Sequence, residues 1–584
     1  MENDTRMKFG KLEINPALNP AILDTGTWHR EAAWAAVHDA ADWMALRSAA
    51  ISGAPLPTSN SLQLYGSSVV WSGDTLALLS GLPDGQQVFL AIGPQAEQLE
   101  IGEPIGSETL AGEGETAPML LALYPTDAPV VDRFVRKLAP ERGPRALGAV
   151  PRLGIGTRMT TAVWPAIWEA MARRGFAANA IQNSVRELNF LETLLAAHPA
   201  ERNIAFGFGA IETGYTGSSY EGLWVAGVLN ALQHGVSSPY GADADHIQVK
   251  RGAGGLERAK RLLEATRYYS FYTLDVSDVL DYAAMASPSA VLLEAAVADP
   301  VSRNEMLAYH RRPRRIGGFD YCPDEAELGR LAGKYWVALD AVVAMHETIR
   351  SLKHGVPFDL ELSIDEHPNE VPTFECLTSE TELIFVLLEA QRRNIPLSHV
   401  APNFGVEKGT DYRGEDGPAG LEVRARILCQ IAEEFGVMAD FHSGDDLSAA
   451  SRQAIGRATA GRNHFKVSPN LQLLFAEVLL EYHPYLFLRW WEDALAYARR
   501  EAAAGSSFAH ACLRQSDRYK PSPQDAVFHN FSFAFVGRRN ADGQFICRET
   551  FYSLSPAFYR AYQERLVDYL FELADDLFCY SDGM

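Results

Sequence analysis

The sequence has few cysteines, and none of them are closely paired. Six cysteines are spread over 584 residues and form no Cys-x-x-Cys motif, which predicts neither a zinc knuckle nor a disulfide framework. The N-terminal stretch MENDTRMKFGKLEINP lacks the basic start, apolar stretch and cleavage site of a secretory signal. The sequence also contains no apolar run of membrane-spanning length. From these absences we expect a cytoplasmic protein.

The chain is also poor in positive charge. It contains 52 Lys and Arg against 74 Asp and Glu, for a net charge of -22, which argues against nucleic acid or an anionic membrane as the main partner. No GxGxxG motif is present, so a nicotinamide cofactor is not expected. What the chain does have is 47% hydrophobic residues, enough for a large core and more than one structural unit. A metabolic protein acting on a small molecule fits this composition.

The two ends of the chain differ in pattern from its middle. A helical stretch at 31–51 is followed by short β-like runs, so residues 1–150 are predicted to form a small α+β unit. Proline and glycine recur between 140 and 151, as is typical of a domain boundary. Residues 491–584 are largely helical in pattern and are predicted to form an extension packed on the preceding domain.

Over residues 151–490, short β-like runs alternate with longer helical ones. This alternation is typical of repeated βα units on a parallel sheet. Eight runs predict an α/β fold of the (β/α)8, TIM-like barrel type. A doubly wound open sheet would give similar local signals, but the polar ends of the runs favour the barrel. The runs are RLGIG (152–156), AANAIQ (177–182), SSPYGADADHI (237–247), YYSFYTLDVS (268–277), FDLELSIDE (358–366), SHVAPNFG (398–405), VMADFHSG (437–444) and NHFKVS (463–468).

Three of these runs end in acids and histidine, and strand ends in a barrel converge on one region. His246, Glu361 and His442 are therefore predicted to bind a divalent metal ion. For an isolated histidine, ordinary core hydrogen bonding is the better interpretation. Here both histidines close predicted strands beside acidic residues, which favours the metal. The ligand types suit Zn, Mn, Ni and Co alike.

Further polar residues lie near predicted strand ends. Asp365 and Glu366 could be ligands or a general acid/base pair, or they could form a solvated strand end. Arg158, in the glycine-rich segment LGIGTRM, could clamp a carboxylate with two hydrogen bonds. Lys408 and Lys466 are cations able to polarise a carbonyl group or bind an anion, although each alone is more often a surface lysine.

Several motifs in a fixed order resemble those of the tagaturonate epimerase family. They are GADADH, FDLELSIDE, APNFGVEKGTDY and FHSGDD, with GIGTR upstream and VFHNFSF downstream. The resemblance extends from about residue 153 to the C-terminus. It implies a metal-dependent barrel enzyme that interconverts D-tagaturonate and D-fructuronate by epimerisation at C4, in hexuronate breakdown. Some relatives act on the neutral ketohexoses tagatose and fructose.

The chain departs from the family pattern in two places. Where the family usually has HSGSDK, this chain has HSGDDL, so Asp445 and Leu447 replace a serine and a lysine. A positive charge beside His442 is thereby lost, which weakens the expectation of a uronate carboxylate as ligand. After the Asp-Glu pair, a short turn is replaced by the longer HPNEVPTFECLTSE.

The substrate chemistry suggests a mechanism. C4 of a 2-ketohexose is not adjacent to the carbonyl, so its hydrogen is not acidic and simple proton removal cannot invert it. The C4 hydroxyl is β to the C2 ketone, so a base could take its proton and cleave the C3–C4 bond, as in a retro-aldol reaction. Transient oxidation at C4 is the rival chemistry. We predict that the catalytic residues are Asp245, Asp365, Glu366 and Lys408, and that the substrate-binding residues are Arg158, Asp243, Ser443 and Lys466.

Two alternatives remain open. A metal-dependent aldose-ketose isomerase could use the same barrel, moving hydrogen between C1 and C2. A non-catalytic protein that binds a sugar acid would keep the barrel without turnover, but clustered titratable groups at strand ends are more typical of catalysis. We expect a homo-oligomer. His529 in VFHNFSF either reaches the site from the C-terminal region or packs in the core.

Overall fold

The structure is a computed structural model of the whole chain. The residues it describes are 7–9, 12–14, 30–59, 61–82, 87–110, 118–157, 161–184, 188–189, 202–205, 209–212, 218–287, 290–365, 372–407, 410–442, 444–517, 520–538, 547, 550–551 and 554–578. Four residues with predicted roles lie outside these ranges: Arg158, Glu366, Lys408 and Ser443.

The N-terminal unit is built around a six-stranded antiparallel sheet. Its strand order is β3-β5-β6-β8-β7, with β4 paired to β5. Side chains of β5 alternate between two cores: Leu76 and Leu78 face a core closed by helices α1 and α2, whereas Ala77 and Leu79 face the core that contains α3. The elements are α1 (Arg30–His38), α2 (Trp43–Ser52), β3 (Gln63–Leu64), β4 (Val70–Ser72), β5 (Thr75–Gly81), β6 (Gln87–Gly93), β7 (Gly106–Leu110), β8 (Met119–Tyr124) and α3 (Ala128–Lys137).

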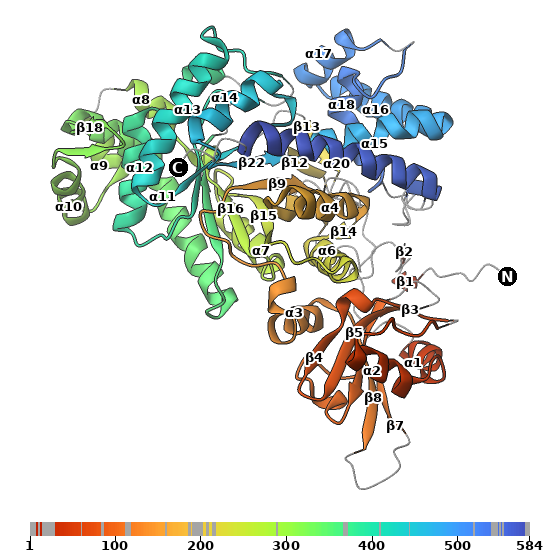
Figure 1. Cartoon of the computed structure of the whole chain (residues 1–584). Coiled ribbons are helices and arrows are strands. Elements are labelled where there is room, and N and C mark those ends of the chain that lie inside the picture. The colour runs from red at the N-terminus through yellow and green to blue at the C-terminus, as the bar shows by residue number, and fades with distance from the viewer. Residues whose placement is uncertain are drawn as a thin grey trace.

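The central domain is a closed barrel of parallel strands, seen in the middle of Figure 1. All eight β-like runs form barrel strands, so the predicted fold class is confirmed. Neighbouring strands follow chain order, and β22 closes the barrel on β9. The strands are β9 (Arg152–Gly156), β10 (Ala177–Ser184), β15 (Tyr240–Gln248), β16 (Phe271–Asp275), β19 (Asp359–Ser363), β20 (His399–Ala401), β21 (Met438–Phe441) and β22 (His464–Val467).

At least one helix lies between each barrel strand and the next, and α15 follows the last strand, so that helices cover the outside of the barrel as the βα repeat requires. Local signals set the helix ends: Ser379 and Glu382 form a capping box at the start of α12, and Gly175 and Gly235 end α4 and α6 in the left-handed conformation. The helices are α4 (Trp164–Arg174), α6 (Tyr220–His234), α7 (Gly255–Ala265), α11 (Glu325–Lys353), α12 (Glu380–Arg392), α13 (Gly417–Glu434), α14 (Ala449–Thr459) and α15 (Pro469–Tyr482).

Short elements interrupt this repeat in two places. Between β16 and α11 lie α8 (Tyr282–Ala286), α9 (Ala290–Ala296), α10 (Pro300–His310), β17 (Arg314–Ile316) and β18 (Phe319–Tyr321). Between β10 and α6 lie β11 (Leu188–Asn189), β12 (Arg202–Ala205), β13 (Gly209–Glu212) and β14 (Ser218–Ser219). A further hairpin, β1 (Met7–Phe9) and β2 (Leu12–Ile14), lies near the N-terminus.

The C-terminal helices pack on the barrel, as Figure 1 shows in blue. Helix α20 contacts α4, α14 and α15, and Arg452 on α14 forms an ion pair of 2.7 Å with Asp576 on α20. The predicted boundary between residues 490 and 491 lies inside α16. The helices are α16 (Pro484–Ala503), α17 (Ser507–Gln515), α18 (Ala526–Phe531) and α20 (Pro556–Phe578).

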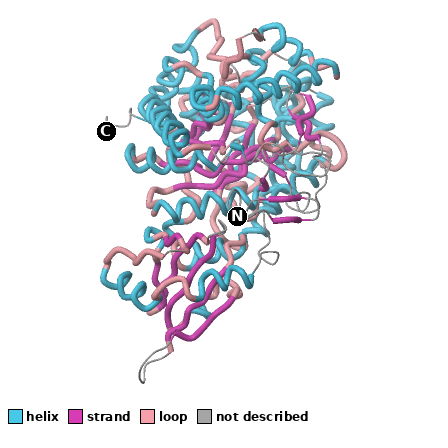
Figure 2. Tube along the Cα trace, turned by 90° about the vertical axis from the view of Figure 1, so that its right-hand side faces the viewer, coloured by secondary structure: helices cyan, strands magenta, loops and turns pink. Residues whose placement is uncertain are grey.

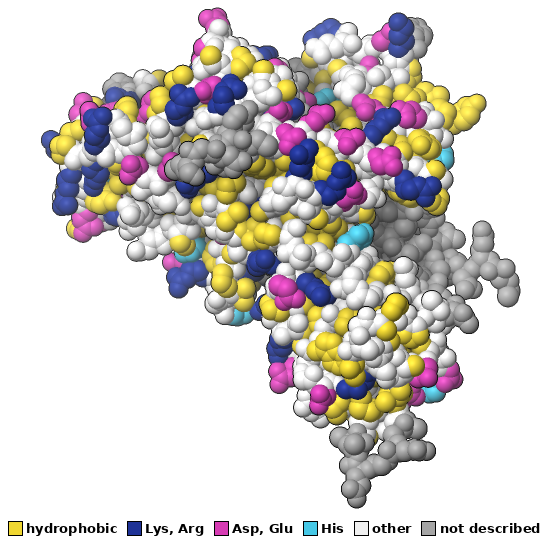
Figure 3. Space-filling view, viewed as in Figure 1, with side chains coloured by type: hydrophobic (Ala, Val, Ile, Leu, Met, Phe, Trp, Pro, Cys, Tyr) yellow, Lys and Arg dark blue, Asp and Glu magenta, His cyan; other side chains and the backbone are white. Residues whose placement is uncertain are grey.

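Figure 2 shows the N-terminal sheet at one end of the molecule, apart from the barrel strands. On the face shown in Figure 3, acidic and basic side chains are interspersed rather than gathered by sign. Among the described helices, none combines the length and apolar character that crossing a bilayer requires.

A buried ion pair closes the amino-terminal end of the barrel. The side chain of Arg152 is fully buried, and its Nη1 lies 3.0 Å from Asp359 Oδ2. The backbone N–H groups of Leu147 and Gly148, in the segment leading into the barrel, donate to the same carboxylate at 2.8 and 2.9 Å. We call this group of four residues the barrel floor. Beside the ion pair, at the first residues of β16, β20 and β22, the rings of Phe271, His399 and His464 pack together, and Phe271 and His464 are the strand partners of Asp359 and Arg152.

Candidate active site

The carboxyl ends of the barrel strands hold a dense cluster of charged side chains around Lys466 of β22. Lys466 Nζ lies 3.0 Å from Asp245 Oδ1 and 2.9 Å from Glu361 Oε2, and it donates to Thr273 Oγ1 at 2.7 Å. Asp243 Oδ2 and Asp440 Oδ2 follow at 3.4 and 3.5 Å. One ammonium group is thus surrounded by four carboxylates contributed by three strands, β15, β19 and β21.

Gly154 on β9 makes room for this lysine. A Cβ atom at Gly154 would lie 2.7 Å from Lys466 Cγ and 2.3 Å from Gln182 Oε1. Any larger residue would therefore collide with the aliphatic part of Lys466 inside the barrel. Glycine in the run LGIG thus allows other atoms to come close to the backbone of β9. The atoms that do so are protein side chains.

His246 occupies an irregularity in β15. The pairing of β15 with β16 shifts between Ala244 and Ile247, and His246 itself has φ 51°, a left-handed conformation that is rare for a residue with a side chain. Its Nδ1 lies 3.2 Å from Asp275 Oδ2 and its Nε2 lies 3.8 Å from Asp245 Oδ1. The bulge turns the imidazole toward the cluster, where its ring centroid is 4.9 Å from that of His442.

His442, directly after β21, lies between two carboxylates. Its Nε2 is 2.7 Å from Glu361 Oε1, and its Nδ1 is 3.1 Å from Asp365 Oδ2. Burial alone would lower the pKa of His442, but Asp365 and Glu361 raise it well above its ordinary value. In this arrangement His442 is a second cation of the cluster.

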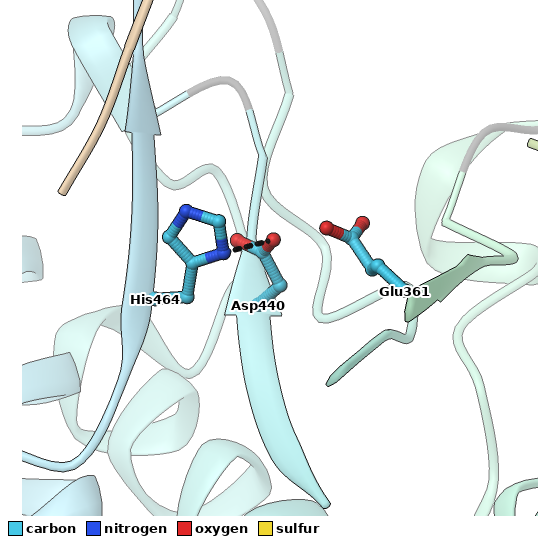
Figure 4. Close-up of side chains that lie close together, drawn as sticks. All are labelled: Glu361, Asp440 and His464. Atoms are coloured by element: carbon cyan, nitrogen blue, oxygen red, sulfur yellow. Dashed lines mark ion pairs between the residues drawn. The ribbon is translucent and has the colours of Figure 1, made fainter. Parts of the chain in front are cut away.

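A deeper triad lies on the same strands. Ligand atoms of Glu361, Asp440 and His464 all fall within 4.8 Å of one another, and Figure 4 shows these side chains close together; they come from β19, β21 and β22. All three side chains are buried, and neither carboxylate oxygen of Asp440 has a hydrogen-bond partner. Imidazole nitrogen and carboxylate oxygen are ordinary ligands for divalent ions. This buried triad could hold a metal ion.

His464 also has a role in the apolar interior. Its Nδ1 lies 2.7 Å from Asp440 Oδ2, and its Nε2 lies 3.5 Å from the Asn179 amide nitrogen. Burial lowers the pKa of His464 and of its neighbour His399 well below the ordinary value. Both rings are therefore neutral, and His464 has one nitrogen directed at Asp440.

The two acids of the GADAD segment carry opposite pKa shifts. Burial raises the pKa of Asp243 to about 8, against the attraction of Lys466. Burial acts in the same direction on Asp245, but Lys466, His246 and His442 outweigh it and lower the pKa of Asp245 to about 2. At neutral pH one carboxyl therefore holds its proton while its neighbour is ionised, a pairing that suits acid/base work.

The structure brings together all of the predicted site residues that it describes. His246, Glu361 and His442 lie around one region with Asp245 and Asp365, whose side chains are 13% and 19% exposed. Lys466 and Asp243, predicted to bind substrate, lie deeper and contact other protein groups, and these two role assignments stay predictions. The predictions for Arg158, Glu366, Lys408 and Ser443 fall outside the described residues.

Sequence reasoning missed four members of the cluster: Thr273, Asp275, Asp440 and His464. A usable signal existed for two of them, because Asp440 lies two residues before His442 and Asp275 ends the run FYTLD. In strands that alternate inward and outward, these positions point into the barrel.

C-terminal elements contact the loop after β21, which contains Asp445 and Asp446 and forms the rim of the site. Asp445 accepts hydrogen bonds from the backbone N–H groups of Ser468 and Asn470, and the Asn470 side chain contacts Tyr569 on α20 at 3.2 Å. His529 Nε2 lies 3.6 Å from Asp446 Oδ1, so this histidine reaches the loop after β21. The C-terminal helices thus help to fix the loop that carries His442.

Comparisons with known proteins identify the family and the fold of this chain. A sequence model of the tagaturonate epimerase family matches residues 209–505. The tagaturonate/fructuronate epimerase of Thermotoga maritima is 29% identical over 288 residues, which is 47% of this chain and 53% of that protein. The chain thus aligns with about half the length of this curated relative.

Solved structures of the fructuronate-tagaturonate epimerase from Cohnella laeviribosi share the fold. The native crystal structure has a TM-score of 0.63 at 21% identity, covering 89% of this chain and 97% of that one. A glycerol complex gives a TM-score of 0.61, also at 21% identity, with 88% and 96% covered. Because the family model spans slightly more than half of the sequence, the chain belongs to the tagaturonate epimerase family.

Proposed function

We propose that this protein is a metal-dependent epimerase that inverts C4 of a 2-ketohexuronate, interconverting D-tagaturonate and D-fructuronate. Family membership and the names of the relatives from Thermotoga maritima and Cohnella laeviribosi support the reaction. The observation that carries the proposal is the convergence of two imidazoles and Glu361 at the carboxyl ends of the barrel strands, where such barrels place their chemistry.

The proposed metal ligands are His246, Glu361 and His442. Both histidines have Nδ1 against a carboxylate, Asp275 at 3.2 Å and Asp365 at 3.1 Å. This is the arrangement that metal-binding histidines usually have, because the carboxylate orients the ring and increases the basicity of the other nitrogen. Glu361 lies at hydrogen-bond distance from His442 Nε2, so a cation would replace the proton shared by these two groups. The donor set therefore fits a divalent ion such as Zn, Mn, Ni or Co.

Glu361 is shared with the deeper triad of Asp440 and His464. We favour the upper set because it supplies two histidines whose Nδ1 atoms each lie against a carboxylate outside the set, Asp275 and Asp365. By contrast, the deeper triad has one histidine, whose Nδ1 lies 2.7 Å from a member of the triad itself, Asp440 Oδ2. In this assignment Asp440 is a further carboxylate beside the metal, and its negative charge raises cation affinity. The positive charge of Lys466 partly compensates the negative charges of the surrounding carboxylates.

When bound, the metal would supply a Lewis acid for the C2 carbonyl oxygen. The chain's own residues would move protons: Asp245 or Asp365 takes the proton of the C4 hydroxyl, the C3–C4 bond breaks, and an enolate and an aldehyde result. Rotation of the aldehyde and re-addition of the enolate carbon to its other face invert C4. The carboxyl that took the proton returns it to the new C4 oxygen, so no oxidant is consumed.

The reaction can be tested by incubation with tagaturonate, fructuronate, tagatose and fructose, after chelation and after each metal is restored. Product stereochemistry is read by NMR. We expect C4 inversion of the uronates, loss of activity on chelation, and recovery with one or more of the ions. Formation of an aldose with C4 unchanged would instead establish an isomerase, and ligand binding without turnover at any metal would establish a binding protein.

A substrate deuterated at C4 separates the two chemical routes. Retro-aldol cleavage leaves the C4–H bond intact, so we expect deuterium to stay at C4 without a primary isotope effect. Transient oxidation breaks that bond and would show a primary effect. The second outcome would reject the retro-aldol route while leaving the epimerase assignment in place.

A further inference from the structure

His246 has a backbone conformation that its own strand does not explain. Its φ of 51° is left-handed, which costs on the order of 1–3 kcal/mol for a residue with a side chain and persists only where surrounding groups hold it. It lies in the irregularity where β15 places two residues, Asp245 and His246, opposite one residue of β16. Strand periodicity therefore does not set the direction of its ring, and a neighbouring group must do so.

The neighbouring group is the carboxylate of Asp275, the last residue of β16. Its Oδ2 lies 3.2 Å from His246 Nδ1 and accepts from Gln248 Nε2, also at 3.2 Å. Its Oδ1 accepts the backbone N–H of Ser277 at 3.0 Å. With a fully buried side chain and a fixed backbone donor on one oxygen, this carboxylate can rotate little. It is a rigid acceptor facing one nitrogen of the histidine.

We propose that Asp275 is a positioning residue: its carboxylate fixes the proton of His246 on Nδ1 and directs the Nε2 lone pair toward Asp245 and His442. The proposal deepens the proposed function, because the lone pair at Nε2 is what a metal ion would bind. The contact of Asp365 with His442 Nδ1 repeats this arrangement on the opposite side of the site. Asp275 itself is fully buried and lies behind the imidazole, so its effect on substrate is indirect.

The substitution Asp275→Asn tests this with almost no change in shape. The amide oxygen must keep the position of Oδ1, because the opposite orientation would place NH2 against the Ser277 N–H. The NH2 group then faces His246 Nδ1, which has to accept a hydrogen bond, and the proton moves to Nε2. Gln248 can turn its own amide oxygen toward the new donor. We therefore expect the variant to hold His246 in the opposite tautomer.

The tautomer is measured from ring ¹⁵N shifts of selectively labelled, metal-free protein, with His246→Asn used to assign the signal. We expect protonated Nδ1 in the wild type and protonated Nε2 in Asp275→Asn. In a separate titration with Zn²⁺ alone, we expect the affinity of Asp275→Asn to fall about 10–100-fold. Asp275→Glu, which retains a carboxylate, should recover the Nδ1-protonated form.

Glu389→Gln is a matched control, because it alters another buried carboxylate–histidine pair. Glu389 Oε1 lies 2.9 Å from His310 Nε2, and both side chains are fully buried. We expect this variant to lose stability while the shifts of His246 and the Zn²⁺ affinity stay unchanged. If Glu389→Gln changed the ring ¹⁵N shifts of His246 as much as Asp275→Asn does, the shifts would report a general loss of stability. That result would overturn the assignment.

Other outcomes also decide the matter. A wild-type His246 protonated at Nε2 overturns the proposal without any variant, as does an Asp275→Asn protein with unchanged tautomer and unchanged Zn²⁺ affinity. If the wild type binds no Zn²⁺, Mn²⁺, Ni²⁺ or Co²⁺, the proposed metal dependence fails. The ring ¹⁵N comparison still shows in that case whether Asp275 sets the tautomer of His246.

Discussion

The two ends of the barrel both bury charged side chains, but they treat them differently. At the barrel floor, Asp359 receives Arg152 Nη1 and the N–H groups of Leu147 and Gly148, so one cation and two backbone donors satisfy one anion. At the opposite end, four carboxylates share Lys466, and Asp440 Oδ1 has no hydrogen-bond partner. The floor is balanced, whereas the site has a surplus of anions.

The difference has a physical meaning. A buried ion pair with satisfied acceptors holds two segments together, here the entering segment and β19, and needs nothing more. A surplus of buried carboxylates destabilises the folded protein unless protons or cations compensate it. In this protein the surplus lies at the carboxyl ends of the barrel strands, the end at which enzymes with this fold place their active sites. Changes at the two ends should therefore affect different measurable properties.

The largest effect is expected from His442→Ala. The change removes one proposed ligand and the partner of Glu361 and Asp365, so we expect kcat/KM to fall by about 10³-fold or more. Metal content, measured after dialysis against a trace of Zn²⁺, should fall with it. His234→Ala removes an exposed histidine on α6 and is expected to leave both values unchanged. Full activity of a metal-free His442→Ala protein would reject the metal assignment.

Lys466→Met should lower the unfolding free energy by an amount that depends on pH. Without the ammonium group, Asp245 and Asp440 lose the charge that lowers their pKa values. Leaving buried charges without their partner costs about 3–5 kcal/mol of unfolding free energy at neutral pH. In the variant we expect burial to raise the folded-state pKa values of Asp245 and Asp440 above their unfolded values. Their protonation then stabilises the fold at low pH, and this stability is lost as the pH rises through the folded-state values.

The measurement is the urea midpoint of Lys466→Met and wild type between pH 5 and pH 8. We expect the deficit of the variant to be larger at pH 8 than at pH 5, because Asp243 already has a pKa of about 8 in the intact cluster and its neighbours would move toward it. Added Zn²⁺ should reduce the deficit. A deficit that is independent of pH would mean that Lys466 contributes packing rather than charge compensation.

Arg152→Met is the matching change at the floor. It leaves Asp359 buried with only its two backbone donors, so we expect a loss of about 3–5 kcal/mol in unfolding free energy. At a temperature where the variant is folded, kcat/KM should remain within about threefold of wild type, because the floor lies at the opposite end of the barrel. A large loss of turnover in folded Arg152→Met protein would mean that the two ends are coupled.

The fold could be predicted from the sequence because each βα unit of the barrel has its own local sequence signals. A strand such as FDLELS alternates inward acids with outward leucines, and Asp359, Glu361, Leu360 and Leu362 take the positions that this period requires. Helix ends were likewise marked by local signals such as Ser379 and Glu382. Eight such units in series leave few ways to close a parallel sheet.

The site was only partly readable because its geometry depends on contacts across strands. His246 turns toward the cluster through a bulge that no local pattern announces. The position of Asp440 two residues before His442 was available, but its contact with His464 depends on the register of β21 and β22. The depth of Lys466 follows from Gly154 on β9, which is distant in sequence. Such positions become visible only when the barrel is closed.

The smallest expected effect concerns the rim of the site, at Asp445→Ser. Asp445 accepts the N–H groups of Ser468 and Asn470 at the start of α15, and so ties the loop after β21 to the loop after β22. A serine hydroxyl is shorter and uncharged, so we expect a loss of about 0.5–2 kcal/mol in unfolding free energy. The control is Asp299→Ser, at the exposed N-cap of α10. There a serine can cap its own helix, and the urea midpoint should change less.

If both variants lose the same small amount of unfolding free energy, Asp445 acts as an ordinary helix cap, and its contact between the two loops adds no further stability. If Asp445→Ser loses more, the tie stabilises the loop that carries His442, and the effect should extend to function through the position of that imidazole. In that case Zn²⁺ affinity should decrease a fewfold in Asp445→Ser and not in Asp299→Ser. The position of the charged side chains in the site would then depend on Asp445, a carboxylate that accepts backbone N–H groups. Asp359 accepts backbone N–H groups in the same way at the barrel floor.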